Sequence, residues 1–308
     1  MDPSHPSDPS DPSDPSQPLR DLKPAKPFFA GIDSDGCVFD SMEVKQKECF
    51  APMFIKHFHL QAAGRYARET WEFVNLYSKS RGCNRFHALT LSLNLLRQRP
   101  EIRARRVAVP DATSLADWTA RESRPSNDTL AAEIQAGNKA LEPVLEWSRA
   151  VNAAIEDIVH GVPPFPLVRE CLEMLTVQAD LIVVSQTPGA ALRREWAENK
   201  IDPYPKLIAG QEMGTKTEHL KFAAAGKYPP ENILMIGDAP GDLKAAKANG
   251  VLFYPIVPHH EEQSWQHLLQ EGLPRFFAGR FAGEFENRLA GEFEASLPAA
   301  PPWTTRPV

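Results

Sequence analysis

Asp33 and Asp35 are carboxylates two residues apart that follow a short apolar run. Alternate side chains of an extended chain point to the same side, so the two acids can face one way while Ser34 faces the other. Acids this close repel, and a bound Mg²⁺ would leave one as a nucleophile and the other for proton transfer. Gly36 permits a sharp turn that brings main-chain amides near a phosphoryl oxygen. A calcium-binding loop or a plain turn is the alternative interpretation of this string.

A second acidic pair, Asp238 and Asp242, lies four residues apart at the start of an expected helix. Carboxylates are favourable at a helix N-terminus because of the helix dipole, but two that face each other repel mildly without a cation. We interpret Asp238 as a metal ligand. Helix capping by an acid is a serious alternative for Asp242.

Ser185 and Lys216 also fall at positions suited to binding a phosphate. Ser185 follows an apolar run and offers a hydroxyl donor, although an isolated serine is more often a turn or cap residue. Lys216 stands at the start of an expected helix, where its charge opposes the dipole, which favours a role in neutralising a phosphate and the aspartates. An ordinary surface lysine is the alternative.

The elements that must position these residues alternate along the second half of the chain. Short apolar runs typical of buried strands are separated by helical segments of about ten residues, which indicates a parallel sheet covered on both faces. The expected strands are residues 28–32, 181–184, 207–209, 232–236 and 251–254. Ligands of such sheets bind at the carboxyl ends of the strands, where the residues above stand.

The first expected strand is separated from the others by about 120 mostly helical residues, so we predict a helical domain inserted into a doubly wound α/β core. Residues 1–26, with their repeated Asp-Pro-Ser, read as a disordered tail, since they can bury little apolar surface. The expected domains are the core at 27–41 and 164–297, the helical insertion at 42–163, and a loose C-terminal tail at 298–308.

The formal net charge of −6 argues against a nucleic-acid-binding protein, which would usually be basic over a face or domain. No apolar run approaches the length of a membrane span, and the N-terminus lacks the apolar stretch of a secretory signal. We therefore expect a cytoplasmic protein that binds neither nucleic acid nor a membrane. A small anionic substrate is compatible with this charge, because a local basic cluster can outweigh the global balance.

The ordered set of motifs resembles the four motifs of the haloacid dehalogenase superfamily. The resemblance spans roughly residues 28 to 258 and rests on order, residue type and position relative to the expected strands. The matching residues are Asp33-Ser34-Asp35-Gly36, then Ser185, then Lys216, then Gly237-Asp238 and Asp242. The resemblance implies a Rossmann-like doubly wound parallel sheet with an inserted α-helical cap domain.

The resemblance also implies roles for these residues. Asp33 would form a phosphoaspartyl intermediate, and Asp35 would protonate the leaving group and then activate water. Ser185 would bind the phosphoryl group, and Lys216 would stabilise the nucleophile and the transferred phosphate. An acid at position 35 indicates phosphate esters, since the dehalogenases of the superfamily lack one there.

The same resemblance implies a Mg²⁺ site. The ion would lie between Asp33, the main-chain carbonyl of Asp35 and Asp238. Asp242 would bind it or orient its water ligands.

The helical insertion resembles the cap of the phosphoglycolate phosphatase and β-phosphoglucomutase group, and residues 78–85 resemble its substrate loop. Lys79, Arg81 and Arg85 are therefore candidates for binding the non-reacting part of an anionic substrate. A solvated basic helix end is the alternative for these three residues. The cap is longer than is usual in this group.

The function that we expect is a Mg²⁺-dependent phosphatase, a hydrolase acting on a small phosphorylated metabolite. A sugar phosphomutase is an alternative, because it shares every core residue and differs in returning the phosphoryl group to the substrate. A non-catalytic binding protein with the same fold is a weaker alternative, since none of Asp33, Asp35, Lys216 and Asp238 is lost. The sequence predicts neither the identity of the substrate nor the oligomeric state.

Overall fold

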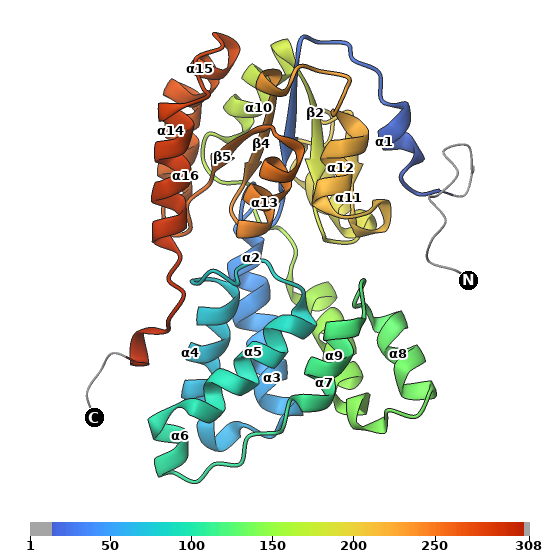
Figure 1. The fold of residues 1–308 in the computed structure, drawn as a ribbon, viewed down its shortest axis with the longest axis vertical. Helices are drawn as coiled ribbons and strands as arrows, with labels where there is room; N and C mark the ends of the chain where they lie inside the picture. Colours follow the sequence, from blue (N-terminus) through green and yellow to red (C-terminus); the bar gives the residue numbers. More distant parts are fainter. Residues whose placement is uncertain (1–13, 305–308) are drawn as a thin grey trace. The chain divides into compact units, whose positions relative to one another are not determined.

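The computed structural model describes residues 14–304, and the chain divides into two compact units (Figure 1). The first, here called the α/β unit, comprises Met1–Asp40 and Gly161–Ser296. The second, here called the helical unit, comprises Ser41–His160 and Leu297–Val308. No helix among the described residues is long and apolar enough to cross a membrane.

The α/β unit contains a five-stranded sheet in which every pairing is parallel, in the order β3-β2-β1-β4-β5. The crossover from β1 to β2 contains Ser41–His160, the larger segment of the helical unit, so the two central strands are distant in the sequence but adjacent in the sheet. The strands are β1 Phe28–Ile32, β2 Ala179–Val184, β3 Leu207–Ala209, β4 Ile233–Gly237 and β5 Leu252–Pro255.

Helices pack on both faces of this sheet, which confirms the predicted doubly wound α/β fold. On one face, residues of β1 such as Ile32 share a core with Leu172, Trp196 and Phe276. On the other face, Gly31 lies so close to Leu220 that an added Cβ would stand 2.9 Å from its Cδ2. The helices of this unit are α1 Gln17–Asp21, α10 Val168–Gln178, α11 Gly189–Glu198, α12 Lys216–Ala223, α13 Pro240–Asn249, α14 Glu261–His267, α15 Leu273–Phe277 and α16 Glu284–Ser296.

The helical unit has its own aromatic core. Trp71 stacks on Phe50 at a centroid distance of 5.8 Å and meets Trp147 edge-on at 5.7 Å. Its first helix is continuous through a π-helical stretch, Lys45–Phe50. The helices are α2 Ser41–Val44, α3 Ala51–His57, α4 Gly64–Asn75, α5 Arg85–Gln98, α6 Pro100–Ala104, α7 Thr113–Arg121, α8 Asn127–Gln135 and α9 Glu142–Ile158.

The segment before β1 differs from the expected disordered tail. Residues 14–26 include helix α1, whose Leu19 is fully buried. Lys227 Nζ donates to the carbonyl oxygens of Leu19, Arg20 and Leu22 at 2.8 to 3.0 Å, which satisfies groups at the helix C-terminus. This segment is held in place by the burial of Leu19 and by hydrogen bonds from Lys227, which is distant in the sequence. Local composition does not indicate such contacts. The Asp-Pro-Ser repeat itself falls mainly in residues 1–13, outside the described residues.

The segment after α16 also differs from the expected loose tail. Trp303 meets the ring of Phe73 edge-on at a centroid distance of 5.4 Å, and its ring lies 4.2 Å from the guanidinium carbon of Arg99. These aromatic and cation–π contacts attach the segment to the helical unit in spite of its prolines. Residues 305–308 lie outside the described part of the chain.

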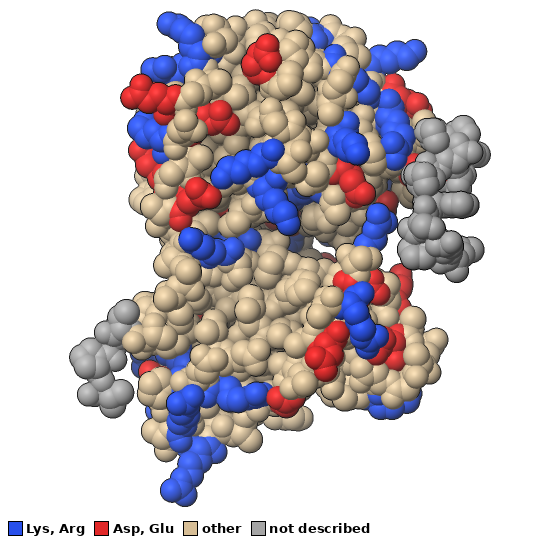
Figure 2. Space-filling model, in the orientation of Figure 1, with Lys and Arg blue, Asp and Glu red and all other residues tan. Residues whose placement is uncertain are grey.

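Figure 2 shows Lys and Arg interspersed with Asp and Glu over the α/β unit, whereas much of the face that the helical unit presents in this view carries neither. Basic side chains gather in this view over α6. The carboxylates of Asp33, Asp238 and Asp242 in the α/β unit are buried and add little to the protein surface.

Candidate active site

The loop after β1 holds Asp33 at the centre of the sheet edge. Its N–H donates to the carbonyl oxygen of Ile236 at 2.9 Å, and the residue is only 5% exposed. Ser34 faces away, since its Oγ accepts a hydrogen bond from Trp196 Nε1 at 3.0 Å inside the core. Gly36 has φ of 76°, a left-handed conformation that suits glycine, and closes the turn by donating to the carbonyl of Phe39.

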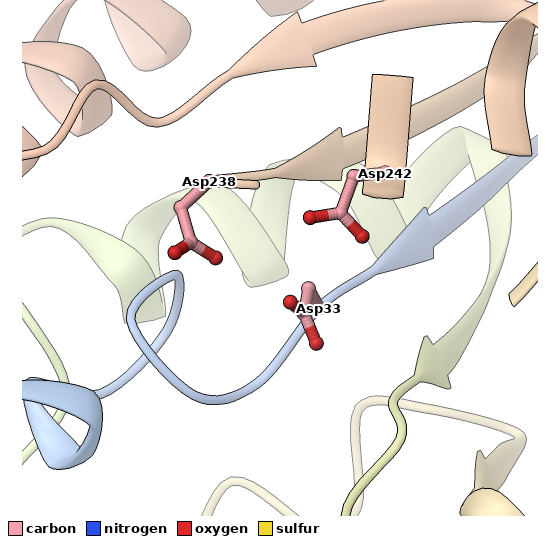
Figure 3. A group of neighbouring side chains, drawn as sticks. All are labelled: Asp33, Asp238 and Asp242. Carbon is pink, nitrogen blue, oxygen red and sulfur yellow. The ribbon is translucent and has the colours of Figure 1, made fainter. Parts of the chain in front are cut away.

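Asp33, Asp238 and Asp242 converge from separate elements onto one point (Figure 3). Each is buried and contributes a carboxylate oxygen, and these oxygens lie within 4.8 Å of one another. Asp33 follows β1, Asp238 follows β4, and Asp242 is in the first turn of α13. The parallel sheet brings the carboxyl ends of the neighbouring strands β1 and β4 together, which is why residues about 200 positions apart can meet.

Gly237 makes room for Asp242. An added Cβ at this glycine would lie 2.3 Å from Asp242 Cγ, a distance that no real contact allows. Asp242 Oδ2 in turn accepts a hydrogen bond from Ala239 N at 3.0 Å and so satisfies one N–H at the start of α13. Helix capping and a place in the carboxylate cluster are therefore both true of Asp242.

Lys216 connects two of these carboxylates. Its Nζ donates to Asp33 Oδ2 at 2.6 Å and to Asp242 Oδ1 at 2.7 Å. The residue opens α12, directly after Thr215, which caps the helix together with Glu218. Its side chain is 13% exposed, so the surface-lysine interpretation does not describe it.

Burial sets the proton affinities of this group. It raises the pKa of Asp33 to about 6, with Lys216 opposing the rise and Asp238 adding to it. The pKa of Asp242 is raised to about 6 in the same way, with Lys216 opposing and Asp33 adding. Burial alone would lower the pKa of Lys216, but the charges of Asp242 and Asp33 outweigh it and hold the pKa above its usual value.

The donor set fits a divalent oxygen-seeking cation. Three buried carboxylates face one ammonium group, so negative charge is in excess when all of them are ionised. Carboxylate oxygens are the ligands that Mg²⁺ takes in proteins, and a cation among them would lower the raised pKa values.

Ser185 and Asp35 are connected through a residue that the sequence did not single out, Thr187. Ser185 is 2% exposed, and its Oγ accepts a hydrogen bond from Thr187 N at 3.2 Å. Thr187 Oγ1 donates to Asp35 Oδ2 at 2.7 Å. A hydroxyl also has one hydrogen to give, so Ser185 can accept from Thr187 and still donate to a phosphoryl oxygen. The only sequence signal that could have indicated Thr187 was its position, two residues after Ser185 and just past the end of β2.

Lys79, Arg81 and Arg85 lie in the other compact unit, before and at the start of α5. Lys79 is exposed. Arg81 is 3% exposed and donates from Nη1 to the Leu76 carbonyl at 2.9 Å, which gives it a role inside the helical unit.

The guanidinium group of Arg85 is bonded to neutral acceptors. Its Nη1 donates to Asn152 Oδ1 at 2.7 Å and to Ser148 Oγ at 3.1 Å. Burial lowers its pKa to about 10, an effect that desolvation of a cation explains.

The chain is similar to one family model and to several solved structures. Residues 122–256 match the family model described as haloacid dehalogenase-like hydrolase. No curated protein sequence matches the chain. Among solved structures, the chain is similar to a haloacid dehalogenase-like family hydrolase from Streptococcus pneumoniae, with 15% identity, 78% of this chain and 90% of that chain covered, and a TM-score of 0.40.

Two further solved structures are similar at the same level. One is a predicted phosphoglycolate phosphatase from Haemophilus somnus, with 15% identity, 75% of this chain and 86% of that chain covered, and a TM-score of 0.45. The other is a subfamily IA hydrolase of the superfamily from Geobacter sulfurreducens, with 17% identity, coverage of 80% and 99%, and a TM-score of 0.39.

Proposed function

We propose that this chain, which belongs to the haloacid dehalogenase-like hydrolases, is a Mg²⁺-dependent phosphatase that cleaves a phosphate monoester of a small metabolite through an aspartyl phosphate on Asp33. The observation that carries the proposal is the buried carboxylate of Asp33, held by Lys216 at 2.6 Å and grouped with two further aspartates. A nucleophile of this kind needs a fixed position and nearby positive charge, because phosphoryl transfer depends mainly on positioning and electrostatics.

In the first step a carboxylate oxygen of Asp33 forms a bond to phosphorus, and the bond from phosphorus to the ester oxygen breaks. Asp35 gives its proton to that departing oxygen. In the second step Asp35 takes a proton from a water molecule, whose oxygen bonds to phosphorus while the bond from Asp33 breaks. Lys216 neutralises charge on Asp33 and the transferred group, and Ser185 donates a hydrogen bond to a phosphoryl oxygen.

Mg²⁺, when bound, would be held by Asp33, the main-chain carbonyl of Asp35 and Asp238, with Asp242 binding it or orienting its water ligands, and would supply neutralisation of the phosphoryl charge. The fit rests on the donor chemistry described above, in which buried carboxylates outnumber the ammonium group. Asp242 contributes in a second way, because it fixes the ammonium group of Lys216 at 2.7 Å.

The non-reacting part of the substrate is the proposed ligand of Lys79 and Arg85. Arg85 supports this role because its guanidinium group donates to the neutral side chains of Ser148 and Asn152, and a desolvated cation is stabilised by an anionic ligand. Burial of Arg81 favours a supporting role for that residue.

The test is phosphate release from a panel of phosphorylated metabolites, with and without Mg²⁺, for the native chain, Asp33→Asn and the control Asp202→Asn. Asp202 is exposed, so its change should leave the rate unaltered. We expect Mg²⁺-dependent release that Asp33→Asn reduces by roughly 10³- to 10⁶-fold, in the range known for loss of a nucleophile. Equal rates for native chain and Asp33→Asn would overturn the assignment.

A further inference from the structure

We propose that Thr187 is a positioning residue for the acid–base step, which it serves by holding the carboxylate of Asp35 through one chosen oxygen. The inference rests on the proposed function and deepens it. The observation behind it is the hydrogen bond from Thr187 Oγ1 to Asp35 Oδ2, at 2.7 Å, between residues 152 positions apart.

Thr187 is itself held at both ends of its backbone. Its N–H donates to Ser185 Oγ at 3.2 Å, and its carbonyl oxygen accepts a hydrogen bond from Gln211 N at 3.1 Å. These bonds tie the residue to the segments that directly follow β2 and β3. Because the backbone of Thr187 is held in this way, its hydroxyl group has a defined position from which it can orient Asp35.

Asp35 is more exposed than Asp33, so packing restricts its side chain less. Asp33 is buried and bonded by Lys216 and by Ser34 N, whereas Asp35 is half-buried and precedes the turn at Gly36. A partly exposed side chain loses rotamer freedom when it takes one orientation, and a hydrogen bond to its carboxylate offsets part of that loss.

The bond also determines which oxygen of Asp35 exchanges the proton. Thr187 donates to Oδ2, so Oδ2 acts as an acceptor and the mobile proton is carried by Oδ1. When the ester bond breaks, that proton moves from Oδ1 to the departing oxygen, and Oδ1 later receives a proton from water. The hydroxyl proton of Thr187 stays in place throughout, so Thr187 acts through Asp35 and not on the substrate.

A purely structural role makes a different prediction. If Thr187 only stabilised the loop after β2, its loss would lower activity toward all esters alike. Positioning of a general acid matters most when the departing group is a poor one, because an alkoxide needs a proton and an aryl oxide such as p-nitrophenolate needs little help.

The experiment compares Thr187→Val, which keeps the shape and removes the hydroxyl, with Thr187→Ser, which keeps the hydroxyl. The kcat/KM is measured for the best alkyl phosphate of the panel and for p-nitrophenyl phosphate. We expect Thr187→Val to lose roughly 10- to 100-fold on the alkyl ester and less than about threefold on the aryl ester. Thr187→Ser should restore most of the loss, and KM should change less than kcat.

Equal losses on both esters, no loss in Thr187→Val, or a Thr187→Ser variant as impaired as Thr187→Val would each overturn the inference while leaving the phosphatase proposal intact. An inactive native chain would overturn the proposed function and this inference with it. If Thr187→Val is unfolded by circular dichroism, Thr187→Ala takes its place with the same expected outcomes.

Discussion

Lys216 Nζ lies 2.7 Å from Asp242 Oδ1, and the same nitrogen lies 2.6 Å from Asp33 Oδ2. One ammonium group thus links the proposed nucleophile to the acid that opens α13. This geometry gives Lys216 two functions, since it orients Asp33 and offsets the repulsion among buried carboxylates. The site consequently has a defined arrangement of its own, which a metal ion can complete.

Loss of this ammonium group should destabilise the fold. We expect Lys216→Met to lower the free energy of unfolding by about 3–5 kcal/mol without Mg²⁺, because it leaves buried carboxylates uncompensated. Lys221→Met, an exposed position on the same helix, is the control and should change little. Urea unfolding with and without Mg²⁺ measures both. Comparable stability of the two variants would mean that Lys216 does not compensate the cluster.

Gly237 and Gly241 form a matched pair for testing the packing of the site. Gly237→Ala should displace Asp242, since the new Cβ would stand 2.3 Å from its Cγ, and should cost about 1–3 kcal/mol and weaken Mg²⁺ binding. Gly241→Ala faces open space and should be neutral or slightly stabilising. Thermal unfolding and Mg²⁺ titration of both variants decide the matter. Normal Mg²⁺ binding by Gly237→Ala would argue against a place for Asp242 in the metal site.

The parts of the site that the sequence could predict are those that depend on local pattern. Apolar runs of strand length located β1 and β3 at their observed bounds and the other strands within about two residues. Parallel strands place their carboxyl ends at one edge, so Asp33 and Asp238 could be expected to meet. The family resemblance, confirmed by the match of residues 122–256, supplied the chemistry.

What the sequence could not predict depends on contacts between distant residues. Thr187 is important only because Asp35 is its partner, 152 positions earlier. Aromatic residues recur at near-helical spacing over residues 276–293, a pattern typical of one helix, but the helix is interrupted between α15 and α16, where Gly279 and Gly283 have positive φ. Because the helical spacing of the aromatic residues continues across this interruption, the sequence pattern does not indicate it.

Mg²⁺ should stabilise the protein more at about pH 7.5 than at about pH 5. The pKa values of Asp33 and Asp242 are raised from 3.8 to about 6, so the folded metal-free chain binds more protons than the unfolded one between these values. The contribution of these groups to stability therefore falls as pH rises through that window. Below about pH 6, protons compete with the metal ion for these carboxylates; above it, the carboxylates are ionised and free to bind the metal.

Thermal unfolding with Mg²⁺ or with a chelator, at both pH values, measures this difference. Asp238→Asn is the companion variant. At the higher pH, the rise in Tm that Mg²⁺ causes should be smaller in this variant than in the native chain. A rise in Tm that is independent of pH, or unchanged in Asp238→Asn, would place Mg²⁺ binding outside this cluster.

The most direct test of the account is to identify the residue that carries the phosphoryl group. Borohydride reduces an aspartyl phosphate to homoserine, so the native chain is quenched during turnover of its best substrate, reduced and sequenced by mass spectrometry. The account predicts homoserine at position 33, and none in Asp33→Asn or without substrate. Modification at another residue, or an unmodified Asp33 in a chain that is releasing phosphate, would contradict it.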